Sequence, residues 1–342
     1  MTALLLVSGG SLLLWISAEG LVRGASALGA QAGISPVVIG LTVVSIGTSA
    51  PELVVCVLAA VRGSPDLAIG NVVGSNLANV GLVLGLAAAV RPLKMAGQVV
   101  RREIPWMLAV TVLLLPVIWN LHLGRVEGAV LGSLLFLYLF FLGAAIRGER
   151  SSRRNGAAST AVAGAAGSGA DVRRSSGRPP AGRPWGRPEG LRLYAVPGFL
   201  VMVGSLGLVA GGQGIVAGST TLADLFGIPE MVIGLSVVAV GTSLPELATT
   251  VVAAVRGEAD LAVGNIVGSN IFNLTFVLGG TALIHPLPIP ASTLRVEYPA
   301  LLLLSVALLP LARSGRDLGR LEGLFLLALY AGAWGWILRG GG

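Results

Sequence analysis

The sequence has few charged residues and very few residues that could support redox or disulfide chemistry. Only 11% of its 342 residues are charged, whereas 54% are hydrophobic, and the mean hydropathy is +0.85. Too few polar side chains remain to cover the surface of a soluble domain, so the chain is predicted to be an integral membrane protein. Its single cysteine, Cys56, excludes an intramolecular disulfide and leaves the redox compartment undetermined.

Two further features of the charge distribution narrow the class of protein. The first twenty residues lack the basic start of a cleaved signal peptide, and we interpret them as a first membrane helix. The formal net charge of +7 does not indicate a nucleic-acid partner, because membrane topology explains the positions of the 23 basic residues.

The apolar segments predict an all-α membrane protein with ten transmembrane helices, since a span needs about 20 mostly apolar residues. Five spans lie in a first repeat at 1–146 and five in a second repeat at 193–342. Between them, residues 147–192 are rich in Gly, Ser, Pro and Arg without apolar periodicity, which predicts a disordered linker. The ten spans are expected near 3–27, 36–61, 67–90, 103–120, 126–146, 194–217, 229–255, 261–284, 297–312 and 320–339.

One stretch of the sequence occurs twice. Residues 40–90 recur from Gly234 at a constant offset of 194 residues, so that GTSAPE (47–52) matches GTSLPE (241–246) and GNVVGSNLAN (70–79) matches GNIVGSNIFN (264–273). Because each unit has an odd number of predicted spans, the second copy must enter the membrane upside down. The sequence therefore predicts two inverted repeats, related by a pseudo-two-fold axis in the membrane plane.

The distribution of Lys and Arg predicts the orientation of these repeats. With both termini outside, the inner connections hold nine basic residues, the outer connections hold four, and the linker adds ten to the inner side. We therefore expect the linker in the cytoplasm. The nine inner residues are Arg23, Arg91, Lys94, Arg101, Arg102, Arg256, Arg313, Arg316 and Arg320.

Each copy of the repeat places one carboxylate, Glu52 or Glu246, directly after a proline within an apolar run. A carboxylate in mid-membrane costs about 3 kcal/mol, and no basic residue occurs inside these spans to offset it. The alternative, a pair of purely structural carboxylates, does not explain the duplication. A metal cation is the simplest counter-charge. Pro51 and Pro245 also free backbone carbonyls near the site, which are tolerated at membrane depth only where they face a cavity or ligand.

Oxygen donors surround both glutamates in the sequence. Calcium binds about six to eight oxygens, and two glutamates would neutralise it, whereas sodium could use the same oxygens singly. The cluster of candidate ligands contains no His and no second Cys, which argues against zinc or copper. The amides could instead join helices, and the hydroxyls could bond to their own helices. The candidate hydroxyl and amide ligands are Thr48, Ser49, Ser75, Asn79, Thr242, Ser243, Ser269 and Asn273.

The doubled motif, GTSxPE followed by GNxxGSNxxN, resembles the alpha-repeats of the sodium/calcium exchanger family, within the cation/calcium antiporter group. The resemblance covers essentially the whole membrane portion. It implies a ten-helix fold with four adjacent cation positions, and alternating access in which the first and sixth helices slide across a static core. It also implies that the glutamates and the eight hydroxyl and amide residues are ion ligands, together with the backbone carbonyls of Ser45 and Ala239.

Two differences from relatives bear on the expected function. Some potassium-dependent exchangers carry aspartate at the position of Asn273, which argues against potassium coupling here. Animal exchangers have calcium-sensing domains in the central loop, whereas this linker contains only three acidic residues, so regulation by cytoplasmic calcium through the loop is not expected.

The expected activity is Na⁺/Ca²⁺ exchange by a secondary antiporter, not an enzyme. An H⁺/Ca²⁺ exchanger and, from another class, a cation channel stay open as alternatives. The expected partners are Ca²⁺, Na⁺ or H⁺ and the lipid bilayer, with no cofactor, no nucleic acid and no obligate protein partner. The absence of targeting signals and the compact size point to a prokaryotic plasma membrane.

Overall fold

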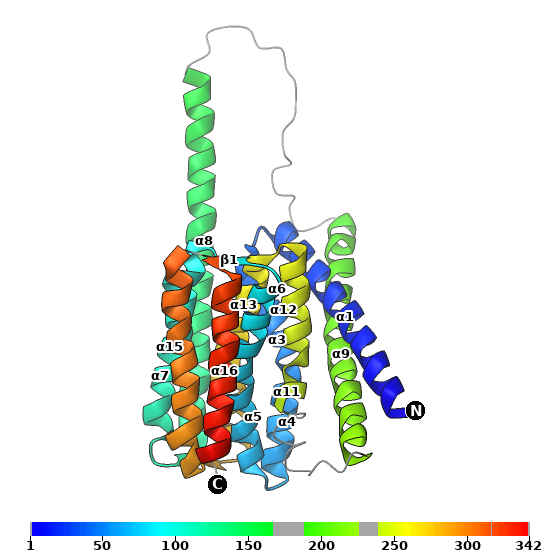
Figure 1. Ribbon diagram of the computed structural model, residues 1–342. Coiled ribbons are helices and arrows are strands. Elements are labelled where there is room, and N and C mark those ends of the chain that lie inside the picture. The colour runs from blue at the N-terminus through cyan, green and yellow to red at the C-terminus, as the bar shows by residue number, and fades with distance from the viewer. Residues whose placement is uncertain (1, 167–187, 226–238, 316, 341–342) are drawn as a thin grey trace.

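The protein is a bundle of helices, seen in a computed structural model that describes residues 2–166, 188–225, 239–315 and 317–340 (Figure 1). The first half contains the elements α1 (Thr2–Ala32), α2 (Pro36–Ile39), η1 (Gly40–Val44), α3 (Ser45–Thr48), α4 (Ala50–Val61), α5 (Pro65–Ala78), η2 (Asn79–Val83), α6 (Leu84–Val90), β1 (Leu93–Lys94), η3 (Val99–Glu103), α7 (Ile104–Ile118), β2 (His122–Leu123) and α8 (Arg125–Ala166). The elements labelled η are π-helical turns.

The second half begins with α9 and repeats the order of the first. Its elements are α9 (Pro188–Leu225), α11 (Ala239–Thr242), α12 (Leu244–Arg256), α13 (Ala259–Phe272), η5 (Asn273–Val277), α14 (Leu278–Ile284), β3 (Leu287–Pro288), η6 (Thr293–Glu297), α15 (Tyr298–Gly315), β4 (Asp317–Leu318) and α16 (Arg320–Gly340).

The bundle is polar at its centre and apolar outside. The continuous helices α5–α6 and α13–α14 are mostly buried, while α1, α8, α9 and α16 bury a third or less of their most apolar segment. Large apolar side chains on the outer helices are exposed, among them Phe136 and Phe140 of α8. Buried Asn, Ser, Thr and Glu side chains gather instead on the inner helices. This arrangement fits a protein surrounded by lipid.

The prediction of a helical membrane protein is confirmed, but the count of ten spans is not. Seven described helices are long and apolar enough to cross a membrane, or eight if the pair 36–48 and 50–61, bent by 42°, forms one broken span. The predicted span at 103–120 falls short because α7 has only 15 residues and the η3 turn before it carries Arg101, Arg102 and Glu103. The first part of the predicted span at 229–255 lies outside the described residues.

The prediction of a disordered linker at 147–192 is wrong at both of its ends. α8 continues as a helix to Ala166 and α9 begins at Pro188. The first proline after residue 147 is Pro179, and the stretch before Ala166 is rich in alanine, so no proline interrupts the helix there. Residues 167–187 of the predicted linker lie outside the described residues.

The first helices of the two halves, α1 and α9, pack side by side in opposite directions (Figure 1). Small residues let their backbones approach closely. A Cβ added to Gly10 would lie 2.7 Å from the Gly211 carbonyl, and one added to Gly211 would lie 2.9 Å from the Gly10 carbonyl. Close approach of backbones through glycine is typical of helix pairs in membranes.

In the described residues, four two-residue strands join the loops of the two halves, and the sequence does not predict them. β1 pairs antiparallel with β4, and β2 pairs antiparallel with β3. β1 lies 194 residues before β3, which is the offset between the repeats, and β2 lies 195 residues before β4. Each half therefore makes equivalent strand contacts with the other half, as expected for two related units in a symmetric arrangement.

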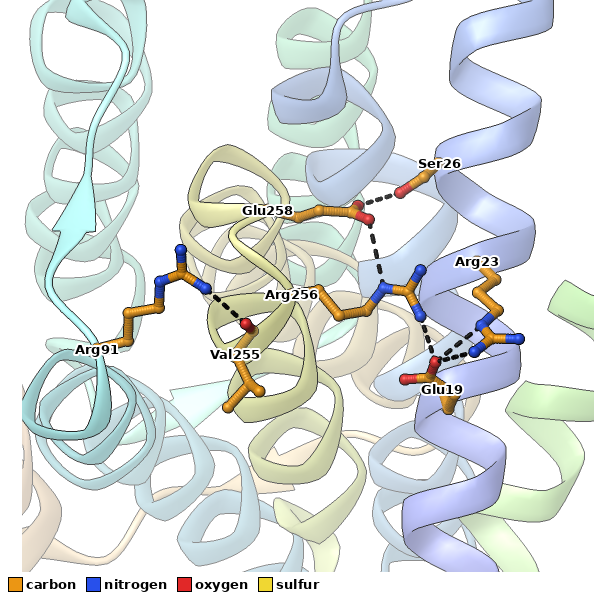
Figure 2. Close-up of polar contacts among 7 residues, drawn as sticks. All are labelled: Glu19, Arg23, Ser26, Arg91, Val255, Arg256 and Glu258. Carbon is orange, nitrogen blue, oxygen red and sulfur yellow. Dashed lines mark hydrogen bonds and ion pairs between the residues drawn. The ribbon is translucent and has the colours of Figure 1, made fainter.

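One end of the bundle, which we call the linker side, is where α8 leaves and α9 enters (Figure 1). On this side α12 ends in a tight turn at Gly257, whose φ is +82°, a value that glycine adopts without strain. Arg91 donates to the Val255 carbonyl at 2.6 Å and so caps the end of α12 (Figure 2). A cation at this position also complements the helix dipole.

The same turn is joined to α1 by charged side chains (Figure 2). Arg256 pairs with Glu19 of α1, and Ser26 of α1 donates to Glu258. Arg256 also lies 3.6 Å from the Glu258 carboxylate. We call Glu19, Ser26, Arg256 and Glu258 the edge cluster. Glu19 therefore lies in an ion pair at the linker side, and its side chain is about one quarter exposed (27%).

Candidate cation-binding site

Two short interruptions in the helices place the candidate site. α3 stops at Thr48 and α4 starts at Ala50, with Ser49 between them at φ −86° and ψ 3°. The same break occurs before α12, where Ser243 has φ −88° and ψ 3°. Proline stands two residues after each break, in the first turn of the next helix. First-turn N–H groups have no partner within the helix, so the missing N–H of proline costs no helical hydrogen bond there.

Each break presents a glutamate in the first turn of the helix that follows it. Glu52 is the third residue of α4, and Glu246 is the third residue of α12. The free N–H groups and the positive end of the helix dipole favour a negative charge at this position. The local sequence Pro-Glu after the break therefore accounts for how two carboxylates are held in the interior.

Both glutamates are fully buried, at 0% exposure, and their charges lie close enough to interact. Ser49 donates to Oε1 of Glu246 at 3.2 Å. Within the described parts of the chain, neither oxygen of Glu52 has a hydrogen-bond partner, and neither does Oε2 of Glu246. A buried charge is normally paired or binds a metal, so three unpartnered carboxylate oxygens need an explanation by function.

The hydroxyl candidates form matching pairs across the two halves. Thr48 of α3 lies 3.4 Å from the Ser269 hydroxyl of α13, and Thr242 of α11 lies 3.3 Å from the Ser75 hydroxyl of α5. All four side chains are buried, at no more than 9% exposure. α3 packs against α13 and α11 packs against α5, so each half supplies one partner of each pair.

The amide candidates begin the π-helical turns η2 and η5. η2, which starts at Asn79, packs against α12, and η5, which starts at Asn273, packs against α4. Asn79 donates to Asn270 at 3.1 Å, and Asn270 donates to the Met107 sulfur at 3.6 Å. Among the described residues, both polar atoms of Asn273 and the Oδ1 atom of Asn79 lack partners. π-Helical turns often mark functional sites.

The structure thus buries every predicted side-chain ligand on the inner helices and brings them to the contacts between halves. Ser243 is also buried, and its hydroxyl lacks a partner in the described residues. The Ser45 carbonyl accepts the Ser49 N–H at 2.9 Å and the Thr48 hydroxyl at 3.4 Å. Ala239 is the first residue of α11. The role of these groups as ion ligands stays a prediction.

Asn71, Asn265 and Cys56 are not among the ligands that the sequence predicts. The structure gives Asn71 two contacts: its Nδ2 donates to the Cys56 sulfur at 3.2 Å, and its Oδ1 accepts from the Thr242 hydroxyl at 3.0 Å. The bond to Cys56 stays within the first half, whereas the bond to Thr242 reaches the second half.

Asn265 makes the corresponding contacts in reverse. Its Nδ2 donates to the Thr250 hydroxyl at 3.1 Å, and its Oδ1 accepts from the Thr48 hydroxyl at 3.3 Å. The sequence carries a signal for this pattern, because the separation of 15 residues between each Asn and its own-half acceptor is the same in both halves. The contact across halves depends on packing and has no signal within one copy.

The chemistry of this arrangement is that of a hard-cation site. Two carboxylates supply a charge of −2, and hydroxyl and amide oxygens from both halves surround them, which matches the donors that Ca²⁺ and Na⁺ accept. Unpartnered buried acceptors each carry a desolvation penalty of about 1–3 kcal/mol. Cations bound among these oxygens would remove that penalty.

Comparison with known proteins identifies the family. The family described as "Sodium/calcium exchanger protein" matches residues 2–144 and 197–338. The chain is 42% identical over 323 residues to the inner membrane protein YrbG of Escherichia coli, covering 93% of this chain and 92% of that protein. It is 34% identical over 335 residues to the sodium/calcium exchanger MaX1 of Methanosarcina acetivorans, covering 90% and 91%.

The fold is also similar to that of a solved exchanger. A structure of the sodium-calcium exchanger NCX_Mj, soaked with Na⁺ and Ca²⁺, superimposes with a TM-score of 0.76 at 26% identity and covers 98% of each chain.

Proposed function

This chain belongs to the sodium/calcium exchanger protein family and is a cation/calcium antiporter, and from that premise we propose that Na⁺ is its coupling ion. In this proposal Na⁺ enters down its gradient and Ca²⁺ leaves in exchange. The observation that carries it is the pair of buried carboxylates, Glu52 and Glu246, one from each half, with oxygen donors around them and no basic partner among the described residues.

The charge of the site explains why the two ions would compete. One Ca²⁺ or two Na⁺ neutralise two carboxylates, so either load removes most of the cost of holding charge inside the membrane. An empty site would keep its full negative charge in the interior. Occupied sites would therefore permit the switch between inward-open and outward-open states, and empty sites would resist it, which is what obligatory exchange requires.

We further propose the ligand set and the membrane arrangement. The ligands are Glu52, Glu246, Thr48, Thr242, Ser49, Ser243, Ser75, Ser269, Asn79 and Asn273, with the carbonyls of Ser45 and Ala239. The two halves are inverted five-span repeats, with both termini outside and the linker in the cytoplasm of a prokaryote. The reciprocal strand pairs and the antiparallel α1 and α9 support two related halves. Transport needs no cofactor and no obligate protein partner.

The test is uptake of radioactive Ca²⁺ into proteoliposomes that contain the full chain and are preloaded with Na⁺. Uptake should require internal Na⁺ and should disappear in Glu52→Gln and in Glu246→Gln. Glu127→Gln is the matched control, because Glu127 lies in the first turn of α8 and accepts from the Gly124 N–H, a bond that glutamine can keep. This control should exchange at the wild-type rate.

Parallel liposomes without Na⁺, with and without a pH gradient, separate the alternatives. Two carboxylates can also carry protons, so uptake driven only by the pH gradient would replace the Na⁺ proposal with proton exchange. Flux that needs no counter-ion and does not saturate would instead indicate a channel and would contradict exchange altogether.

A further inference from the structure

Asn71 and Asn265 are the second residues of the second motif in each repeat. They are not in the proposed ligand set, but both contact residues that are. Asn71 of α5 is 5% exposed and Asn265 of α13 is 0% exposed. Each uses its nitrogen to hold a helix of its own half, and its oxygen to receive a threonine hydroxyl from the other half.

The atom that accepts the proton of each threonine hydroxyl decides whether a lone pair of that hydroxyl can face a cation. A hydroxyl has one proton and two lone pairs, and a cation can use only the lone pairs. The Thr242 hydroxyl lies 3.0 Å from the Asn71 oxygen and 3.3 Å from the Ser75 hydroxyl. The Thr48 hydroxyl lies 3.3 Å from the Asn265 oxygen, and 3.4 Å from both the Ser45 carbonyl and the Ser269 hydroxyl. A threonine hydroxyl that gives its proton to an asparagine oxygen can present a lone pair, and not its proton, to a cation.

We propose that Asn71 and Asn265 are positioning residues, each of which orients the threonine of the opposite half so that its lone pairs face a bound cation. The proposal rests on the proposed function, because it assumes that Thr48 and Thr242 bind the transported ion. Groups that orient the ligands of a metal typically change its affinity by about 10- to 100-fold when they are removed.

The crossed arrangement has a consequence for exchange. Thr48 belongs to the first half but is oriented by Asn265 of the second, and Thr242 belongs to the second half but is oriented by Asn71 of the first. A threonine is thus oriented only while α3 stays against α13, or α11 against α5. Ion affinity is tied in this way to the relative placement of the two halves.

The own-half contacts of the two asparagines differ in one atom. Asn265 donates to the oxygen of Thr250, whereas Asn71 donates to the sulfur of Cys56, which is a weaker acceptor. The Asn265 pair therefore offers the cleaner test, because oxygen accepts at one end of the amide and a hydroxyl donates at the other.

The test is a double-mutant cycle on Asn265 and Thr48, with Ca²⁺ binding to the full chain in detergent measured by calorimetry. Asn265→Leu removes the acceptor at similar volume, and Thr48→Val removes the hydroxyl. Asn265→Leu alone should weaken Ca²⁺ binding about 10-fold or more. Added to Thr48→Val, it should cause no further loss, because no hydroxyl is left to orient.

The symmetry of the chain supplies the control cycle, in which Asn265→Leu is combined with Thr242→Val. The Thr242 hydroxyl bonds to Asn71 and not to the Asn265 amide that holds Thr48, so here the two losses should multiply. Melting temperatures of all variants are measured alongside. Losing the bond to Thr250 should lower them equally in both cycles, so a purely structural role cannot produce the difference between cycles.

Two results would overturn the proposal. Losses that multiply in both cycles would show that Asn265 does not act through Thr48, and unchanged Ca²⁺ affinity with a lower melting temperature would leave Asn265 a purely structural role. Calorimetry needs no transport, so failure here is distinct from failure of the Na⁺ proposal. A wild-type protein that binds Ca²⁺ without Na⁺-driven flux would contradict only the coupling ion.

Discussion

The two copies of the repeat make matching contacts at the centre of the molecule but different contacts at its linker-side edge. At the centre, contacts recur in both halves: Thr48 meets Ser269 as Thr242 meets Ser75. At the edge, the pair between Glu19 and Arg256 has no described counterpart.

The residues at the equivalent edge positions explain why the pair occurs once. At the offset of 194 residues, Gln213 stands in place of Glu19, Arg62 in place of Arg256, and Ser64 in place of Glu258. Gln213 and Arg62 are both exposed. Water can solvate an edge side chain that loses its partner, whereas a buried oxygen at the centre depends on its neighbours for hydrogen bonds. The two copies can therefore differ at the edge at little cost.

Breaking the packing at the centre should have the largest effect on stability. Gly264 of α13 faces the backbone of α2 and η1, and a Cβ added there would lie 2.6 Å from the Val37 carbonyl. Gly264→Ala should therefore destabilise the protein by about 1–3 kcal/mol, the usual range for overpacking. The shift should also separate Asn265 from the Ser45 hydroxyl, now 2.9 Å from its carbonyl. The apparent melting temperature in detergent measures the effect.

The matched control for this prediction is Gly280→Ala. Gly280 also lies in a helix, but no described atom comes within 4 Å of an added Cβ. This variant should melt at or slightly above the wild-type temperature, because alanine favours a helix by up to about 1 kcal/mol over glycine. Equal melting of both variants would mean that the backbones at Gly264 can move apart freely.

The sequence predicts the centre better than any other part of the chain. Glu52 and Glu246 stand out because a carboxylate in an apolar run is costly and because the repeat places it twice. The family resemblance drawn from the same motifs is confirmed. The crossed bonds of Asn71 and Asn265 escape such reasoning, because they depend on which helix of one half packs against which helix of the other.

Other parts of the fold have weak signals for physical reasons. The two-residue strands are too short to show alternation, and a π-helical turn differs from an α-helix by one extra residue per turn, without a distinct pattern. The extension of α8 to Ala166 depends on helix propensity, a weak signal beside the loss of apolar periodicity after residue 146. The ion-pair partners of exposed charged residues such as Arg256 cannot be predicted from a single sequence.

A smaller effect should sharpen the comparison within the centre itself. Ser49 is bonded to Glu246 at 3.2 Å, whereas Ser243, its counterpart, has no described partner. If both serines bind the transported ion, Ser49→Ala and Ser243→Ala should each raise the KM for Ca²⁺ several-fold, because each removes one oxygen ligand. Concentration-dependent uptake into Na⁺-loaded proteoliposomes measures this. An effect confined to Ser49→Ala would remove Ser243 from the ligand set.

The smallest effect is expected at the edge, from Arg256→Gln compared with Arg62→Gln. The side chains of Arg256 and Glu19 are 32% and 27% exposed, so water screens their pair, and Arg23 offers Glu19 a second partner at 2.7 Å. Removing Arg256 should therefore destabilise the protein by no more than about 1 kcal/mol. Arg62→Gln should leave the melting temperature unchanged, since no ion pair of Arg62 is formed in the described residues.

Salt gives this last comparison a second test. The difference in melting temperature between wild type and Arg256→Gln should shrink as ionic strength rises, because exposed charges are screened beyond about 10 Å at 0.1 M salt and beyond about 3 Å at 1 M. A difference that survives in 1 M salt would mean that Arg256 stabilises the turn at Gly257 through packing of its side chain and not through its charge. Equal destabilisation by Arg62→Gln would instead show that the two edges are equivalent in solution, and the contrast between a matched centre and an unmatched edge would fail.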